Sequence, residues 1–114
     1  MKNEYALESI VYKNEEKKLY LQFKDGFNSS LSTELLRVES PSAEVQGHSK
    51  IQKQIVLNKN NVAIKNIERV GNYAVRIHFD DGHNTGIYSW RLLRSMAKNS
   101  EKIIKNYYNR LKKI

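Results

Sequence analysis

The stretch YAVRIHFDDGHNTGIYSWRLLR, residues 73–94, decides the fold of this chain. At its start every second side chain is large and apolar, namely Tyr73, Val75, Ile77 and Phe79. This alternation is typical of a β-strand with one buried face. Residues 80–84 then have turn chemistry, because Gly82 can take a positive φ without a steric penalty. The stretch therefore opens with a strand and a tight turn.

A short strand and a helix are predicted after this turn. Residues 86–88 return as the strand, and Ser89 stands at a helix N-cap position, where its hydroxyl can accept a backbone N–H. From Trp90 to Lys113 apolar side chains recur every three or four residues, which predicts one helix of roughly 36 Å. A helix of this length extends beyond a small sheet. Its apolar stripe then indicates contact with a partner or a second copy, unless the helix lies wholly on its own sheet.

A weaker copy of the unit occurs at residues 19–37, LYLQFKDGFNSSLSTELLR. Its Phe-x-Asp-Gly motif matches the later one at an offset of 56, and its Leu-Leu-Arg motif matches at an offset of 57. Ser32 is expected to cap a short helix that Pro41 ends. We therefore predict a single domain, residues 1–114, built from two related strand–turn–strand–helix halves.

The other segments are predicted from their local patterns. Further strands are expected at residues 5–12, 18–23, 54–57 and 62–70. Gly71-Asn72 is expected to form a two-residue hairpin turn, and the polar, aperiodic residues 42–53 predict a loop. The fold class is therefore α+β: antiparallel β-hairpins in one or two small sheets, a short helix after the first half and a long C-terminal helix.

The composition restricts the compartment and the chemistry. The chain has 114 residues, 39% of them hydrophobic, and no cysteine. It can form neither disulfides nor thiolate metal sites, which suits a reducing compartment. The N-terminal residues lack the apolar core of a signal peptide, and no apolar run reaches the roughly 20 residues that span a bilayer. We therefore expect a cytoplasmic protein without a membrane segment.

The net charge of +8 is concentrated at the C-terminus. Residues 89–114 hold eight Lys or Arg and one acidic residue, whereas residues 1–88 hold 12 basic and 11 acidic residues. These basic side chains could contact nucleic-acid phosphates, with Tyr107 and Tyr108 stacking on bases. They are Arg91, Arg94, Lys98, Lys102, Lys105, Arg110, Lys112 and Lys113. The alternative is a solvated face that keeps the protein soluble.

The Asp-Asp-Gly-His turn holds the best candidates for chemistry. Asp81 and His83 could perform acid–base work or bind a hard metal, alone or with His48 from the predicted loop. The alternative is a plain hairpin turn whose aspartates cap backbone N–H groups. The chain has no Ser–His–Asp order, no Gly-rich phosphate loop and no His-x-Glu arrangement, so we do not predict an enzyme.

LLRVESPSAEVQGH (35–48), followed by VGNYAVRIHFDDGHNTGIYSW (70–90), resembles the N-terminal domain of gamma-butyrobetaine hydroxylase. Domains of that family occur alone in bacteria, at the front of the oxygenase, and appended to P-loop ATPases that handle iron–sulfur clusters. The family is largely one of unknown function. The resemblance implies an accessory domain linked through its relatives to iron–sulfur or metal metabolism.

In its oxygenase branch the family resembles a zinc module with a Cys-Pro-Cys-x-x-Cys motif and the His of Asp-Gly-His. The matching positions in this chain are Ser40, Ser42, Val45 and His83. One His cannot hold structural zinc, which takes four nitrogen or sulfur ligands. The resemblance therefore implies the fold without its metal, and no cofactor is expected. We expect the hydroxyls of Ser40 and Ser42 to hold the turn through hydrogen bonds to backbone groups.

The expected function is that of a non-catalytic accessory domain that binds another protein. Two alternatives are open: nucleic-acid binding through the basic C-terminal helix, and metal binding by His83 with His48 or Asp81. A homodimer through the C-terminal helix is a further expectation.

Overall fold

The computed structural model describes residues 6–46 and 57–113. The described residues form two three-stranded antiparallel sheets, with strand orders β1-β2-β3 and β4-β5-β6. The strands are β1 (Leu7–Lys13), β2 (Lys18–Phe23), β3 (Asn28–Ser32), β4 (Ile64–Val70), β5 (Ala74–Phe79) and β6 (Ile87–Ser89). The helices are α1 (Thr33–Val38), α2 (Ala43–Gln46), α3 (Trp90–Lys98) and α4 (Ser100–Leu111). The fold is α+β, as predicted.

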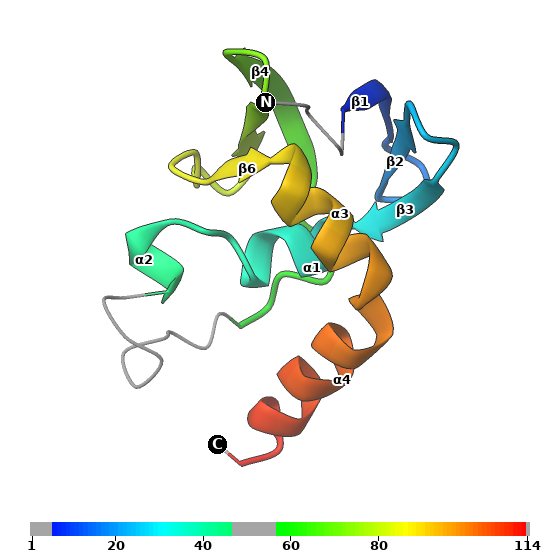
Figure 1. Cartoon of the computed structure of the whole chain (residues 1–114). Helices are drawn as coiled ribbons and strands as arrows, with labels where there is room; N and C mark the ends of the chain where they lie inside the picture. The colour runs from blue at the N-terminus through cyan, green and yellow to red at the C-terminus, as the bar shows by residue number, and fades with distance from the viewer. Residues whose placement is uncertain (1–5, 47–56, 114) are drawn as a thin grey trace.

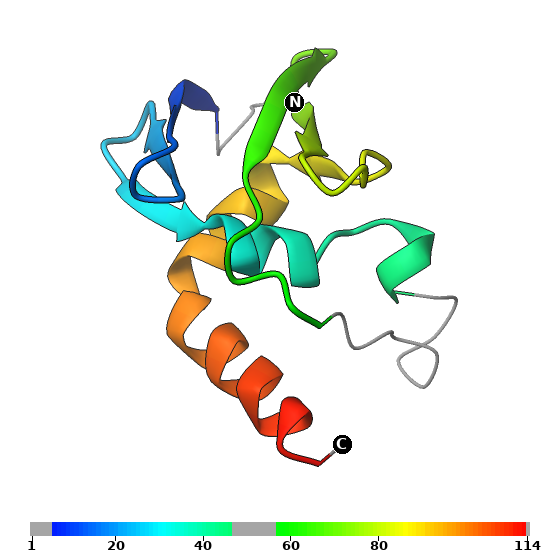
Figure 2. The same ribbon diagram turned by 180° about the vertical axis from the view of Figure 1, so that it is seen from behind.

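Each sheet leads into a helix that packs near the middle of the molecule. In Figures 1 and 2, α1 and α3 cross at the centre, below both sheets, and α4 leads away from them. A hydrophobic cluster combines side chains from both halves of the chain. Its buried members include Leu19, Phe23, Leu36, Val75, Ile77, Phe79 and Leu93. The two halves therefore share one apolar interior.

The two halves also share their local geometry. Both Asp-Gly turns place glycine at a positive φ, 94° at Gly26 and 92° at Gly82, which residues with a Cβ rarely adopt. The hydroxyls of Ser32 and Ser89 each accept the N–H of the third following residue, at 3.1 and 3.0 Å, and so cap α1 and α3 as predicted. The first strand of each sheet carries one register shift against its neighbour. The order of elements is the same in both halves.

The turn before β5 differs from the prediction. β4 and β5 pair as far as Val70 and Ala74, so three residues connect the strands instead of two. Gly71 takes a φ of 55°, so the turn begins directly after Val70. Tyr73 consequently lies in the turn and is 59% exposed, although the alternating pattern placed it on the buried face. The prediction for Tyr73 was wrong because a strand pattern does not reveal where the turn ends.

The C-terminal helical segment is divided at Asn99 into α3 and α4, where the sequence predicted one helix. Asn99 has a φ of −113° and a ψ of 15°, and its side-chain Nδ2 donates to Ser95 O at 2.8 Å. An asparagine side chain can compete in this way with the helical hydrogen bonds of the backbone. After the break α4 contacts α1, and its Tyr107 is 1% exposed. The end of the C-terminal segment therefore packs against α1 of its own domain.

The predicted loop at residues 42–53 is partly helical, because Ala43–Gln46 form α2. Its remaining residues, and most of the predicted edge strand 54–57, lie outside the described residues. Within residues 6–46 and 57–113, none of the helices has the length and apolar character needed to cross a membrane.

Candidate functional site

The four residues that match the family's zinc positions converge in one buried corner. The chain leaves α1, passes Ser40-Pro41-Ser42 and enters α2, beside the turn between β5 and β6 that carries His83. The exposed fractions are 0% for Ser40, 6% for Ser42, 2% for Val45 and 6% for His83. We call these four residues the serine–histidine corner.

Hydrogen bonds connect the polar members of the corner. His83 Nε2 lies 2.9 Å from Ser40 Oγ and 3.4 Å from Ser42 Oγ. Ser40 Oγ also accepts the N–H of Ser42 at 3.4 Å, which is the predicted bond from a hydroxyl to the backbone. Ser42 Oγ instead contacts the His83 ring. The carbonyl of Ser40 accepts Gln46 Nε2 at 3.0 Å, which connects the start of the turn to α2.

The β5–β6 turn fixes the position of His83. Phe79 N–H donates to His83 O at 2.9 Å, and Gly82 N–H donates to Phe79 O at 3.2 Å. His83 N–H donates to Asp81 Oδ1 at 3.1 Å. The ring centroids of Phe79 and His83 lie 6.0 Å apart. Backbone bonds and aromatic packing together direct the imidazole toward the two serines.

Gly86 is required beside the corner for a steric reason. A Cβ at this position would lie 2.3 Å from Ser40 Oγ, which is closer than nonbonded atoms can approach. The adjacent Tyr88 is fully buried and its hydroxyl donates to Leu36 O. Burial raises the pKa of Tyr88. The sequence prediction missed Gly86 and Tyr88, and only the pairing of β6 with β5 brings them to the corner.

The carboxylate of Asp81 forms ion pairs with two basic side chains outside the corner. Its Oδ2 accepts Arg37 Nε at 2.8 Å and Lys59 Nζ at 2.7 Å, and its side chain is 18% exposed. Partial burial by itself raises the pKa of Asp81. The hydrogen bonds from Lys59, the His83 N–H and Arg37 lower it by more, and the resulting pKa is about 2. Asp81 is therefore a carboxylate that connects the second half to Arg37 of α1.

These positions do not suit the metal that the family's zinc module would hold. Ser40 and Ser42 supply neutral hydroxyls and Val45 supplies no donor, whereas structural zinc takes four nitrogen or sulfur ligands. Among residues 6–46 and 57–113 there is no group of three or more His, Asp, Glu or Cys placed to hold a metal ion. The Asp81 carboxylate and the His83 ring have different partners, and His48 lies outside the described residues.

The basic residues of the C-terminal segment separate into two groups. Arg94 and Arg110 are bound internally, Arg94 to Asp25 and Arg110 to Glu39. The other six are exposed, namely Arg91, Lys98, Lys102, Lys105, Lys112 and Lys113. Tyr107 is buried, and the hydroxyl of Tyr108 donates to Glu34 Oε1 at 2.6 Å. The predicted phosphate contact by Arg94 and base stacking by Tyr107 are therefore wrong, because both side chains are buried.

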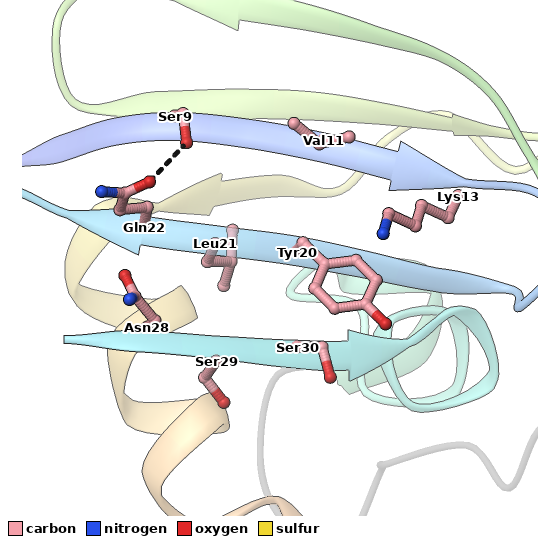
Figure 3. A pocket seen from close by; sticks show the side chains of 9 residues that line it. All are labelled: Ser9, Val11, Lys13, Tyr20, Leu21, Gln22, Asn28, Ser29 and Ser30. Atoms are coloured by element: carbon pink, nitrogen blue, oxygen red, sulfur yellow. Dashed lines mark hydrogen bonds between the residues drawn. The ribbon is translucent and has the colours of Figure 1, made fainter.

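A shallow groove lies on the outer face of the first sheet, away from the serine–histidine corner. Figure 3 shows its lining side chains on three neighbouring strands, with Tyr20 on the central one. Its volume is about 470 Å³. It is lined by Ser9, Val11, Lys13, Tyr20, Leu21, Gln22, Asn28, Ser29 and Ser30. Val11 is 50% exposed, and Lys13 Nζ lies 4.6 Å from the centre of the Tyr20 ring. We call this feature the outer groove.

Comparison with known proteins identifies the family. The family described as gamma-butyrobetaine hydroxylase-like, N-terminal, matches residues 10–94, from within β1 to within α3. The chain belongs to this family.

Three solved structures resemble the chain over most of its length. A solution structure determined by NMR is 45% identical with a TM-score of 0.81, and covers 93% of this chain and 79% of its own. A second NMR structure is 34% identical with a TM-score of 0.78, over 92% and 82%. A crystal structure from Acidithiobacillus ferrooxidans is 35% identical with a TM-score of 0.70, over 85% and 98%.

The crystal structure is described as a protein of unknown function that belongs to the DUF971 family. No curated protein matches the chain significantly.

Proposed function

We propose that this chain is a non-catalytic accessory domain that acts by binding another protein. The observation that carries the proposal is the state of its candidate reactive groups. His83, Ser40 and Ser42 are buried, and the His83 ring is hydrogen-bonded to both serine hydroxyls. The carboxylate of Asp81 forms ion pairs with two basic side chains. Groups that perform acid–base or nucleophilic chemistry have to reach a substrate. Those groups contribute here to holding two segments of the fold together.

Domains of this family also occur appended to P-loop ATPases that handle iron–sulfur clusters, and this suggests the setting of the partner. We propose that the partner belongs to iron–sulfur or metal metabolism, and that this domain acts beside the metal without binding it. The absence of good metal ligands in the serine–histidine corner supports this division of roles.

Affinity capture with competition tests the proposed function. The immobilised domain is incubated with native lysate, once with and once without nuclease treatment, and retained proteins are quantified by mass spectrometry. We expect one or a few proteins to be retained saturably and to be displaced by the free domain. Retention that is not displaced, or that disappears with nuclease treatment, would contradict protein binding. Loss with nuclease would instead support the second candidate below.

A second candidate function is nucleic-acid binding through the exposed lysines of α3 and α4. The observation that favours it is that Lys98, Lys102 and Lys105 are exposed and have no ion pair with a described residue. Lysines placed in this way attract phosphates and release counterions on binding. The burial of Tyr107 removes one stacking platform, so any such binding would depend mainly on charge.

Titration with duplex DNA and with RNA at two salt concentrations tests this candidate. The variant Lys102→Gln/Lys105→Gln should lower the salt dependence of log K by about 2 if both lysines contact phosphates. Lys24→Gln/Lys65→Gln is the matched control, because it removes the same charge from exposed positions outside the C-terminal helices, in the turn after β2 and in β4. Equal effects of the two variants would indicate general attraction by net charge.

A further inference from the structure

β3 is an open edge of the first sheet. It is the last strand in the order β1-β2-β3, and it pairs with β2 in continuous register. Thr33 N–H donates to Lys17 O at 3.0 Å just beyond the ladder. Hydrogen-bonded and non-hydrogen-bonded pairs alternate in an antiparallel ladder, so Ser29 and Leu31 bond to β2. Asn28 and Ser30 therefore direct their backbone N–H and C=O groups outward, where no described residue bonds to them.

The other three edges of the two sheets carry features that discourage strand addition, and β3 does not. β1 and β4 each have a register shift and charged side chains along the strand, and β6 has only three residues. Natural proteins protect exposed edges with bulges, charges, proline or short strands. β3 is five residues long, with the sequence Asn-Ser-Ser-Leu-Ser, and has neither a charge nor a proline. This edge is unprotected.

Grooves flank this edge on both faces of the sheet. The outer groove reaches the edge at Asn28 and Ser30 (Figure 3). A second groove of about 240 Å³, which we call the inner groove, lies between β3 and the start of α4. It is lined by Lys18, Ser30, Leu31, Ser32, Leu35, Ser100, Glu101 and Ile104. Ser30 lines both grooves, so the edge at this residue is open from either face.

This arrangement suits an added strand. Successive side chains of a strand point to opposite faces, so an extended peptide along β3 would place alternate side chains in the outer and the inner groove. In strand addition the main-chain hydrogen bonds give affinity, and pockets for alternate side chains give specificity. We propose that β3 binds an extended segment of the partner protein as a fourth strand of the first sheet. This inference rests on the proposed function and names the surface that performs it.

The chemistry of the two grooves describes the segment. Leu31, Leu35 and Ile104 give the inner groove an apolar floor, which fits an apolar side chain. The outer groove is lined by Val11 and Tyr20 as well as by polar side chains. At the edge its lining is Asn28 and Ser30, which fit a polar side chain, and Lys13 adds a positive charge that attracts an acidic one. The segment therefore alternates apolar residues with polar or acidic ones. A second copy of β3 fits less well, because its sequence Asn-Ser-Ser-Leu-Ser has one apolar residue and no acidic residue.

Selection from a displayed library of random peptides of ten residues tests the proposal. Selected peptides are synthesised and titrated against the wild type, Ser30→Pro and Ser30→Ala. Proline removes the outward N–H and is tolerated on an edge strand, whereas alanine keeps the N–H and is the matched control. We expect alternating sequences whose affinity falls about tenfold or more for Ser30→Pro and stays unchanged for Ser30→Ala.

Peptide chemistry keeps the test independent of the folding of the Ser30→Pro variant. N-methylation of every second backbone amide of a selected peptide should weaken its binding to the wild type about tenfold, and methylation of the intervening amides should not. The proposal is overturned by a library without binders, by binders that ignore both changes, or by a dimer in sedimentation that Ser30→Pro dissociates. If the Ser30→Pro variant still retains the partner from lysate, the edge of β3 is not the binding surface, although the proposed function as a protein-binding domain stands. If no partner is displaceable, the proposed function itself fails.

Discussion

Arg94 donates two hydrogen bonds to the carboxylate of Asp25, at 3.0 and 2.9 Å, and so connects α3 to the Asp-Gly turn of the other half. Arg37 of α1 makes the reciprocal contact with Asp81 in the second turn, at 2.8 Å. In each half, therefore, the helix supplies an arginine to the other half and the Asp-Gly turn binds the arginine that the other half supplies. The exchange holds the two sheets in a fixed relation around the shared apolar cluster.

Replacing Arg94 by lysine should lower the melting temperature by several degrees. The guanidinium group of Arg94 makes a two-pronged contact with Asp25 and lies 4.2 Å from the Phe27 ring centre, whereas a lysine ammonium is a point charge that cannot reproduce the fork. Scanning calorimetry of Arg94→Lys measures the change. Lys98→Gln changes an exposed residue of the same helix and is the control, and its melting temperature should equal that of the wild type. Equal melting of Arg94→Lys and the wild type would show that the fork adds no stability.

Acid should remove the contribution of Asp81 to stability between about pH 4 and pH 2. The folded-state pKa of Asp81 is about 2, below its ordinary value of 3.8, because the hydrogen bonds from Lys59, His83 N–H and Arg37 outweigh the effect of burial. A lowered pKa stabilises the fold above the unfolded-state pKa, and this stability is lost as the pH falls through the folded-state pKa. Urea unfolding at several pH values should give a less steep loss over this range for Asp81→Asn. An equally steep loss would mean that Asp81 is not the group responsible.

The sequence was sufficient to predict the features that local chemistry determines. The capping roles of Ser32 and Ser89 and the positive φ of Gly82 depend on neighbours within a few residues. The gathering of Ser40, Ser42, Val45 and His83 was suggested only by the family resemblance, because 43 residues separate Ser40 from His83.

The contacts between the halves could not be predicted, because they depend on how each helix packs against the turn of the other half. Charge alone places Arg94 on a basic surface, although the repeated Leu-Leu-Arg motif makes it the equivalent of Arg37, and both arginines form ion pairs with the other half. A repeated Asp and a repeated Arg at fixed offsets are the signal that could have suggested a pair. The end of α3 at Asn99 was missed because the apolar period continues through the break.

The packing of α4 against the rest of the domain should depend on Tyr107. Its side chain is 1% exposed, whereas the neighbouring Tyr108 is 43% exposed and is bonded to Glu34, which raises the pKa of Tyr108 to about 12. Truncating a buried aromatic ring costs about 3–5 kcal/mol, so Tyr107→Ala should lower the unfolding free energy by about 3 kcal/mol. Tyr108→Phe, which removes only an exposed hydroxyl, is the control and should cost far less. Urea titration measures both, and similar losses would show that α4 is not anchored by Tyr107.

Removal of the two hydroxyls in the serine–histidine corner should destabilise the fold. In Ser40→Ala/Ser42→Ala the buried His83 Nε2 loses both serine contacts, at 2.9 and 3.4 Å. An unsatisfied buried polar group costs about 1–3 kcal/mol, and the double variant should unfold at a correspondingly lower urea concentration. Ser95→Ala, at an exposed position of α3, is the matched control. A double variant as stable as this control would mean that the hydroxyls do not hold the turn.

Restoring cysteine at three positions should create a zinc site in the same corner. Ser40 and Ser42 already place their Oγ atoms within 3.4 Å of His83 Nε2, and Val45 is buried beside them with its N–H bonded to Ser42 O at 3.2 Å. Ser40→Cys/Ser42→Cys/Val45→Cys would add three thiolates to one imidazole, a set that structural zinc accepts in a tetrahedral arrangement. We expect one zinc per chain by elemental analysis after gel filtration, and a melting temperature that a chelator lowers.

Two further proteins make this last outcome decisive. Adding His83→Ala to the triple variant removes the fourth ligand and should weaken zinc retention, whereas the wild type should retain no zinc and melt at the same temperature with and without chelator. If the triple variant retains zinc equally well without His83, the cysteines bind it in some other geometry. If it retains none, the corner is too closely packed around its hydrogen bonds to accept a metal, and serine and valine then define a different structure from the family's zinc module.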